Sequence, residues 1–337
     1  MTDASAEQHF DVVGIGNAIV DVLARASDAM LGELGLAKGS MTLVDAEAAH
    51  ALYRKMGPAI ECSGGSAANT IAGIASLGGR AAFIGKVKSD TLGAVFRHDI
   101  VSLGVHFATS PAADGAATAR CLVFVTPDAQ RTLQTYLGAS VELGPEDIDD
   151  RVVAAAEITY LEGYLYDPPR AQAAFRKACD IAHTAGRKVA LSLSDPFCVN
   201  RHRSAFRALV EGEVDILFAN EHEIMALYET RRFEEAIEAV RGECEIACLT
   251  RSDKGSLILS EEGLEVIEAA PVAKVVDTTG AGDLYAAGFL YGHTHGYGVR
   301  ASARLASLCA AEVIGHLGAR PEVSLRDLAR ENGLLSD

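Results

Sequence analysis

The pattern of hydrophobic and polar residues alternates along the chain between strand-like runs and helix-like spacing. Short apolar runs ending in glycine or serine are typical of buried strands, as in DVVGIG (11–16) and RKVALSLS (187–194). Between such runs lie longer stretches with apolar residues at helical spacing, such as ANTIAGIASLGG (68–79) and RAQAAFRKACDIAHTAG (170–186). This alternation predicts a three-layer α/β/α fold, with helices on both faces of a mostly parallel sheet.

Two parts of the chain depart from this rhythm. The stretch TARCLVFVTPDAQRTLQTYLG (118–138) has two β-rich runs around a polar PDAQ, which predicts a hairpin, and GSMTLVD (39–45) predicts an isolated strand. We expect the β segments near 20–45 and 107–138 to form a small sheet that serves as a lid. No long linker interrupts the sequence, so residues 1–337 are expected to form a single domain.

Composition narrows the class of protein. The chain has 30 Lys and Arg against 46 Asp and Glu, a formal net charge of −16, which argues against nucleic-acid binding and against an anionic membrane surface. Its seven cysteines are scattered and show no disulfide framework. The polar, acidic start MTDASAEQHF is unlike a signal peptide, and no apolar run approaches the roughly 20 residues of a membrane span. We expect a cytoplasmic protein.

The candidate chemistry centres on DTTGAGD (277–283), which lies between a strand predicted at AKVV (273–276) and a helix predicted over 283–293. Gly280, Ala281 and Gly282 lie at the start of that helix, where unpaired N–H groups and the helix dipole favour an anion. Asp283 has two interpretations. It is either an ordinary acid of the first turn or a general base that accepts the proton of a hydroxyl attacking a phosphoryl group. We predict the base, with the three small residues stabilising the transferring group.

Two other glycine-rich stretches need weighing. GIGNAI (14–19) begins like a dinucleotide-binding fingerprint, but Ile19 replaces its last glycine, so that interpretation is weak. The sequence contains no G-x-x-x-x-G-K-[ST] motif. SGGSAAN (63–69) is compatible with a simple turn and helix start, yet Asn69 is a polar residue in the first turn of an otherwise apolar helix and favours a ligand site.

Together these motifs resemble the ribokinase-like, or PfkB, family of small-molecule kinases. DTTGAGDLYAAGFL (277–290) is similar to its C-terminal signature, SGGSAAN to its N-terminal glycine pair and Asn, and NEHE (220–223) to its N-x-x-E motif. GNAIVD (16–21) and LSLSDPF (191–197) resemble the adenosine kinase branch most. The resemblance implies a ribokinase-like fold, ATP as phosphate donor, Mg²⁺, and K⁺ as a further cation.

The resemblance also implies roles for individual residues. Those expected to bind the acceptor are Asn17, Asp21, Gly64, Gly65, Asn69 and Asp283. Those expected near ATP are Asn220, Glu223, Thr250, Gly255, Gly282 and Gly318. Asn220 and Glu223 would serve Mg²⁺ through water, although N-x-x-E is also the pattern of a helix capping box, and both readings can hold together. Asp277 and Thr279 would surround a monovalent cation.

Three functions stay open at this point. The first is a nucleoside kinase that converts adenosine to AMP in purine salvage, with inosine or guanosine as other acceptors. The second is a sugar kinase of the same fold, acting on ribose, fructose or a related sugar. Apolar residues of the lid segments favour a base over a sugar, although they are equally compatible with the core of the lid: Met41, Leu43, Phe124 and Leu133. The third is a ligand-binding member without turnover, which the intact GAGD (280–283) disfavours. The partners expected are ATP and a small acceptor, with the chain a monomer or a homodimer.

Overall fold

The computed structural model describes residues 9–128 and 130–335, and the polar start of the chain at 1–8 lies outside the described residues. Within them an eight-stranded main sheet has the order β13-β12-β11-β10-β9-β8-β1-β5. Its strands are β1 (Phe10–Ile15), β5 (Ala81–Ile84), β8 (Ala156–Glu162), β9 (Lys188–Ser192), β10 (Ile216–Asn220), β11 (Ile246–Thr250), β12 (Ser256–Ser260) and β13 (Gly263–Ile267). All neighbours pair in parallel except β11 with β12 and β12 with β13.

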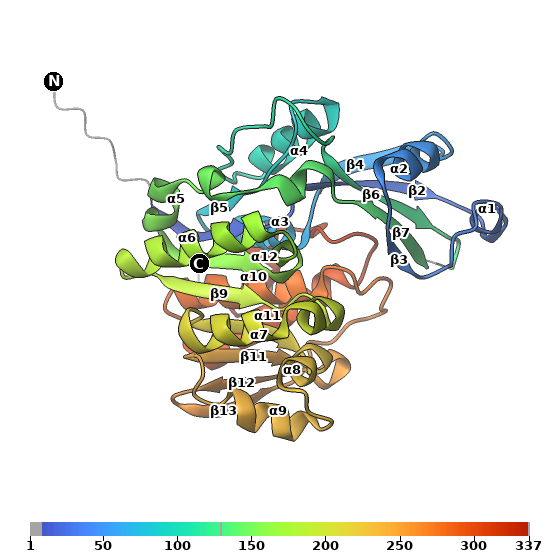
Figure 1. The fold of residues 1–337 in the computed structure, drawn as a ribbon. Coiled ribbons are helices and arrows are strands. Elements are labelled where there is room, and N and C mark those ends of the chain that lie inside the picture. The colour runs from blue at the N-terminus through green and yellow to red at the C-terminus, as the bar shows by residue number, and fades with distance from the viewer. Residues whose placement is uncertain (1–8, 129, 336–337) are drawn as a thin grey trace.

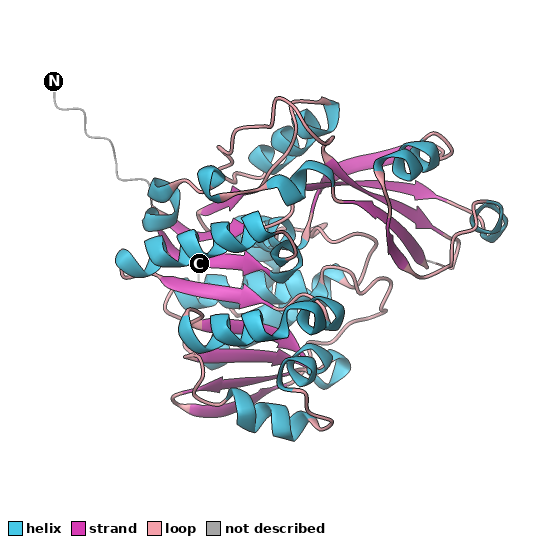
Figure 2. Cartoon of the chain, viewed as in Figure 1, coloured by secondary structure: helices cyan, strands magenta, loops and turns pink. Residues whose placement is uncertain are grey.

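Helices cover both faces of this sheet (Figures 1 and 2). One face carries α3 (Ser66–Ser76), α10 (Ala281–Thr294), α11 (Val299–Val313) and α12 (Leu325–Glu331), whose buried side chains share one core cluster. The other carries α5 (Asp150–Ala155), α6 (Pro169–Thr184), α7 (Pro196–Gly212), α8 (Glu221–Tyr228) and α9 (Phe233–Val240). Alternation along β1 explains the division, since Val12 joins the first cluster and Val13 the second. The three-layer prediction is confirmed.

A second sheet stands to one side of the main sheet (Figure 1). It has the order β3-β7-β6-β2-β4 and consists of β2 (Ile19–Arg25), β3 (Met41–Leu43), β4 (Ala59–Gly64), β6 (Ala119–Val125) and β7 (Arg131–Tyr136). The helices α1 (Asp28–Glu33), α2 (Ala46–Tyr53) and α4 (Thr91–Ser102) accompany it. The hairpin predicted within 118–138 is confirmed, because β6 and β7 pair antiparallel. Strand β4 also belongs to this sheet, which the sequence pattern did not reveal.

The two faces of the second sheet differ in burial. Val20, Val22, Leu122 and Phe124 are buried in the large core cluster. The opposite face carries Asp21 and its cross-strand neighbours Cys62 and Cys121, together with Val123 and Leu133. On the edge strand β3 of that face, Met41 and Leu43 are 52% and 55% exposed. This half-open apolar face, which we call the lid face after the role expected of this sheet, also carries Asp21.

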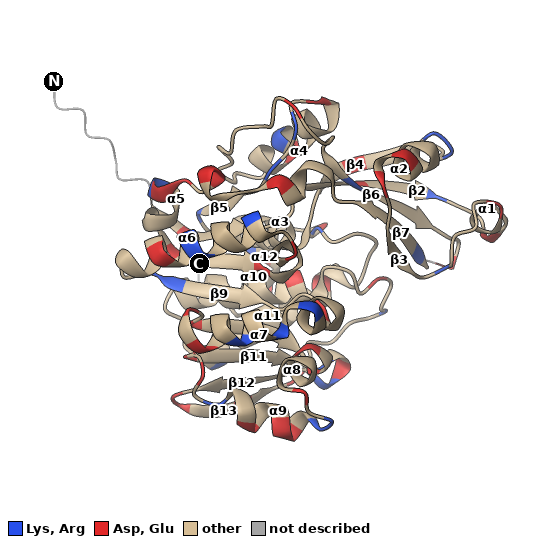
Figure 3. Ribbon diagram, in the orientation of Figure 1, with Lys and Arg blue, Asp and Glu red and all other residues tan. Residues whose placement is uncertain are grey.

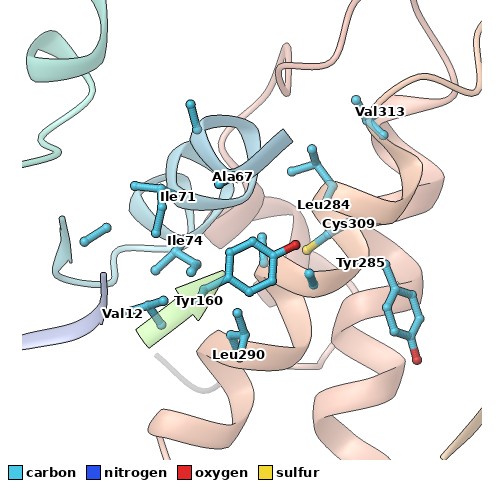
Figure 4. Close-up of a cluster of buried hydrophobic side chains, with 14 of the residues drawn as sticks. Val12, Ala67, Ile71, Ile74, Tyr160, Leu284, Tyr285, Leu290, Cys309 and Val313 are labelled. Atoms are coloured by element: carbon cyan, nitrogen blue, oxygen red, sulfur yellow. The ribbon is translucent and has the colours of Figure 1, made fainter. Parts of the chain in front are cut away.

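Tight packing of α3 against α10 brings the starts of these two helices together. The ring of Tyr160 lies among Ile74, Leu284 and Leu290 (Figure 4), all of which are fully buried or nearly so. At Gly73 an added Cβ would lie 2.7 Å from the Cβ of Ala287, so only a residue without a side chain allows this approach. The core therefore fixes where SGGSAAN meets GAGD.

One local prediction is wrong. AKVV (273–276) looks like a strand by composition, but it is irregular, and the N–H of Val276 donates to the Ile314 carbonyl at the end of α11 at 2.8 Å. The segment therefore leads into α10 without joining either sheet. In the described ranges no helix combines the length and apolar character of a membrane span. Acidic segments recur along the outer helices, with basic segments interspersed (Figure 3).

Candidate active site

The predicted motifs meet at the carboxyl edge of the main sheet. β1 lies between β5 and β8, so the chain builds the sheet in both directions from β1. Ligands in open α/β sheets bind in the crevice at such a switch point, beyond the carboxyl ends of the strands. Asn17 follows β1 and Glu162 ends β8, which places both in this crevice.

Asp283 is held by the first turn of α3. Its Oδ1 accepts from the Ser66 hydroxyl at 2.6 Å, and its Oδ2 accepts from Asn69 Nδ2 at 2.9 Å. Burial raises the pKa of Asp283, although the bonds from Ser66 and Asn69 and the charge of Arg320 counteract part of the rise. Asn69 Oδ1 is buried and finds no partner in the described part of the chain. An orphaned acceptor beside a carboxylate is suited to a ligand with two donor groups, one for each of them.

The start of α10 is open to an anion. Gly280 is its N-cap, with φ 79°, and the described residues provide no side-chain cap for this turn. The N–H groups of Gly282 and Asp283 are therefore first-turn donors without the usual cap, while the Ala281 N–H donates to the Thr278 carbonyl at 3.3 Å. A Cβ at Gly280 would lie 2.9 Å from the Ala319 Cα, which together with the positive φ explains the glycine. Gly282 is exposed and contributes an accessible amide.

The glycine pair of SGGSAAN lies against the substrate-side carboxylate predicted from GNAIVD. A Cβ at Gly64 would overlap the Asp21 carboxylate, and one at Gly65 would overlap the Asn17 carbonyl oxygen. Burial raises the pKa of Asp21 to about 6, while the charges of Arg320 and Arg131 lower it. The structure thus brings Asp21, Gly64, Gly65 and Asn17 together.

Asn17 is fixed by a buried glutamate that the sequence analysis did not single out. Glu162 is 1% exposed, and its Oε1 accepts from Asn17 Nδ2 at 2.6 Å while its Oε2 accepts from the Ala67 N–H at 2.8 Å. Ser140 donates to Asn17 Oδ1 at 2.8 Å. Burial raises the pKa of Glu162 to about 7. Glu162 therefore ties the end of β1 to the start of α3.

Asn220 and Glu223 form the capping box that N-x-x-E predicts. Asn220 Oδ1 accepts from the Glu223 N–H at 2.9 Å, and Glu223 Oε2 accepts from the Asn220 N–H at 2.8 Å. Burial, together with the charges of Asp195 and Asp283, raises the pKa of Glu223 to about 7, although the bond from the Asn220 N–H lowers it. Each carboxylate oxygen keeps a lone pair for water, so the pair fits a water-mediated Mg²⁺ site, and a cation would relieve the carboxylate repulsion.

The remaining donor-side residues lie close to this pair or at turns. Thr250 ends β11 and is opposite Asn220 in the parallel pairing. Gly255 has φ 78° in the turn to β12, and a Cβ there would overlap the Ile267 carbonyl oxygen, so this glycine has a structural reason of its own. The backbone of Gly255 bonds to Arg251 and Ser252, neither of which is among the residues predicted near ATP.

Asp277 connects three segments. Its Oδ1 accepts from the Thr279 N–H at 3.0 Å and its Oδ2 from the Gly318 N–H at 3.0 Å. Arg131 of β7 forms an ion pair with the same carboxylate at 2.9 Å, and both side chains are 7% exposed. A guanidinium from the second sheet thus meets Asp277, so a monovalent cation at this place would rely on backbone carbonyls. Among the described residues no cluster of three or more His, Cys, Asp or Glu is arranged to hold a metal.

Sequence reasoning missed three polar residues of the crevice, namely Ser66, Glu162 and Arg320. Ser66 lies inside a motif that was already recognised. A glutamate inside the apolar run EITYLEGY was a detectable signal for Glu162, because buried carboxylates need partners. Arg320 has no local signal, since its partners Ser63 and Ala68 are more than 250 residues away in sequence.

Comparisons with known proteins agree with this geometry. A model of the pfkB family of carbohydrate kinases matches residues 59–325. A curated ATP-dependent ribose-1-phosphate kinase from Halopiger xanaduensis is 30% identical over 262 residues, covering 77% of this chain and 83% of the relative.

Two solved structures are similar over nearly the whole chain. The adenosine kinase from Sinorhizobium meliloti superposes with a TM-score of 0.89 at 53% identity, covering 96% of this chain and 100% of the other. A probable sugar kinase from Rhizobium etli superposes with a TM-score of 0.90 at 49% identity, covering 97% and 99%. These relatives differ in the acceptors that their names give.

Proposed function

The chain belongs to the PfkB family of carbohydrate kinases and is a phosphotransferase with a hydroxyl acceptor, and from that premise we propose that it phosphorylates the 5′-hydroxyl of adenosine. ATP is the donor that the family implies, and the product is AMP. The observation that carries the choice of acceptor is the position of Asp21 and the glycine pair beside the apolar lid face. A ribose diol suits the carboxylate and close backbone approach, and a flat base suits Met41, Leu43 and Leu133.

One aromatic residue of the second sheet does not lie on the lid face. Phe124, which was compatible with either a base pocket or the core of the lid, is fully buried on the face of the second sheet opposite Leu133. The proposal therefore relies on aliphatic side chains of the lid face. Leu23 and Ile19 of β2, partly buried on the same face, extend that surface toward Asp21.

The residues of the crevice divide the reaction between acceptor and donor. Asp283 accepts the proton of the attacking hydroxyl, and the unpaired Asn69 Oδ1 beside it accepts from a second donor group of the acceptor. The amides of Gly282 and Asp283 stabilise the negative charge on the transferring phosphoryl group. The carboxylate thus faces the acceptor and the amides face the donor, which is why an acid can lie at an anion-binding helix start.

Mg²⁺ bound beside the donor phosphates would neutralise their charge, with Asn220 and Glu223 holding its water shell. We propose that K⁺ binds the backbone around Asp277 and Thr279 and that Thr250, Gly255 and Gly318 line the nucleotide. We also propose that the second sheet is the lid of a single domain, because Arg131 already joins it to the loop that starts α10.

The acceptor is tested by measuring ADP formation with adenosine, inosine, guanosine, ribose, ribose 1-phosphate and fructose. We expect kcat/KM for adenosine to exceed that for every sugar by at least about 10²-fold, because a sugar leaves the lid face empty. A sugar that matches or exceeds adenosine would establish the second candidate, a sugar kinase, which the Rhizobium etli structure keeps in view.

Replacing Glu223 by Gln tests the metal role. The amide keeps the size of the side chain but removes the charge, so the Mg²⁺ concentration for half-maximal rate should rise by about 10-fold, in keeping with the loss of an outer-shell partner. Glu221→Gln, in the same turn of α8, is the matched control and should leave this concentration unchanged. A lower melting temperature with an unaltered Mg²⁺ dependence would reduce Glu223 to a capping residue.

A further inference from the structure

Residues 318–320 follow α11 and contact both signature motifs at once. The Gly318 N–H donates to Asp277 at 3.0 Å, Ala319 lies against Gly280, and Arg320 reaches the other motif. No sequence motif marks this segment. One short segment therefore contacts both sides of the crevice, namely the DTTGAGD loop and the start of SGGSAAN.

The guanidinium of Arg320 donates hydrogen bonds to backbone oxygens of SGGSAAN (63–69). Its Nε and Nη2 donate to the Ser63 carbonyl at 3.1 and 2.9 Å, and its Nη1 donates to the Ala68 carbonyl at 2.6 Å. Nη2 also donates to the Ser63 hydroxyl at 2.9 Å. These contacts join the end of β4 to the first turn of α3, the two segments on either side of Gly64 and Gly65.

Ser63 is gripped from its other side by α4. Its N–H and hydroxyl both donate to Asp99 Oδ2, at 2.7 and 2.5 Å. Ser63 is fully buried, so Asp99 and Arg320 form a charge pair bridged by one serine. A planar guanidinium can donate to the Ser63 and Ala68 carbonyls at the same time, a forked arrangement that a lysine ammonium cannot reproduce in the same geometry.

We propose that Arg320 is a positioning residue for phosphoryl transfer, which holds β4 and α3 so that Ser66 and Asn69 grip Asp283. The proposal rests on the proposed role of Asp283 as the base. Asn69 immediately follows Ala68, whose carbonyl Arg320 binds, so loss of the guanidinium frees the turn that carries the carboxylate's partners.

The charge of Arg320 should affect the pKa of Asp283, and therefore the pH dependence of kcat, which a purely structural role would leave unchanged. The groups facing it are Cys62 of β4, Asp99 of α4, Asp21 of β2 and Asp283 of α10. Asp283 is faced by Ser66 and Asn69 of α3, and its charge also acts on Glu162, Glu223, Tyr160 and Tyr164. Arg320 lowers the pKa of Asp283 against the effect of burial, so its removal should raise that pKa.

The experiment compares Arg320→Met, Arg320→Lys and the control Arg326→Met, an exposed arginine of α12 in the same C-terminal region. In Arg320→Met we expect kcat to fall by about 10²-fold, as for a misplaced reacting group, and the acidic limb of the kcat profile to move to higher pH. In Arg320→Lys kcat should fall by about 10-fold, again through lost geometry, while the limb stays near its wild-type position. The control should match wild type.

Wild-type kcat and an unmoved acidic limb in Arg320→Met would overturn the proposal, and so would a loss of activity with no shift of the limb. If Arg320→Met does not fold, Arg320→Lys provides the test. Wild-type kcat in Arg320→Lys would show that the two carbonyl contacts of the guanidinium are not needed for catalysis, and the proposal would be wrong. All variants are assayed with whichever acceptor the wild type uses best. A sugar as best acceptor would therefore refute the adenosine proposal and leave the test of Arg320 intact.

Discussion

Asp283→Asn is expected to lower kcat by about 10²- to 10⁴-fold while folding and nucleotide binding persist. The amide fills the same space between Ser66 and Asn69 but cannot take the proton of the attacking hydroxyl. The measurement is steady-state ADP formation with adenosine, together with ATP affinity by calorimetry. Asp180→Asn on α6, an exposed carboxylate, is the matched control and should keep wild-type kcat.

The same assignment predicts a direction for the pH dependence. Burial raises the pKa of Asp283 above that of an ordinary aspartate, so the carboxyl becomes protonated, and unable to act as a base, at a higher pH than usual. The kcat of the wild type should therefore fall as pH decreases through that raised pKa, and the Asn variant should lose this limb. A fully active Asn variant, or one that retains the limb, contradicts the role of general base.

The chemistry that is local in sequence was predictable. Gly280, Ala281, Gly282 and Asp283 are consecutive, and a helix start imposes their relation to an anion whatever the rest of the fold does. The pair Asn220 and Glu223 is three residues apart, and the capping box predicted from that spacing is present. Strand–helix alternation likewise determines the layers, because each element must bury one face.

What depends on pairing across the fold was not predictable. Period-two alternation separates Phe124 from Val123 but does not tell which of them faces the ligand, and the structure buries Phe124 on the other side. The partners of Glu162 lie 95 and 145 residues away, so only the juxtaposition of β1, β8 and α3 explains it. AKVV misled because a run of four residues, three of them apolar, carries little information about the length of an element or its neighbours.

The second large effect concerns Asp21. Asp21→Ala should raise the KM for adenosine by roughly 10²-fold, the worth of one or two hydrogen bonds to a charged acceptor. Its pKa of about 6 means that the carboxylate form is lost as pH falls below about 6, so wild-type affinity for the acceptor should weaken there. In Asp21→Asn this pH dependence should vanish. Asp114→Ala, an exposed carboxylate within 107–138, is the control and should behave like wild type.

We also propose that Asp21 connects acceptor binding to closure of the second sheet over the crevice. A kinase must keep water from the phosphoryl group, so the crevice should be sealed when the acceptor is bound. Asp21 lies on β2, which pairs with the edge strand β4 on one side and with β6 on the other, and Arg131 of the same sheet reaches Asp277. We therefore expect a ligand held by Asp21 to stabilise the sheet and its contact with the α10 loop together.

Amide hydrogen exchange tests this link without any turnover. Adenosine alone, in the absence of ATP, should increase protection of β6 and β7 in the wild type, and Asp21→Ala should abolish that increase while Asp114→Ala preserves it. Fructose should leave protection unchanged, because it cannot fill the apolar lid face between Met41 and Leu133. Equal protection by fructose would favour a sugar as the acceptor. No change with any nucleoside or sugar would mean that the second sheet does not close over the acceptor.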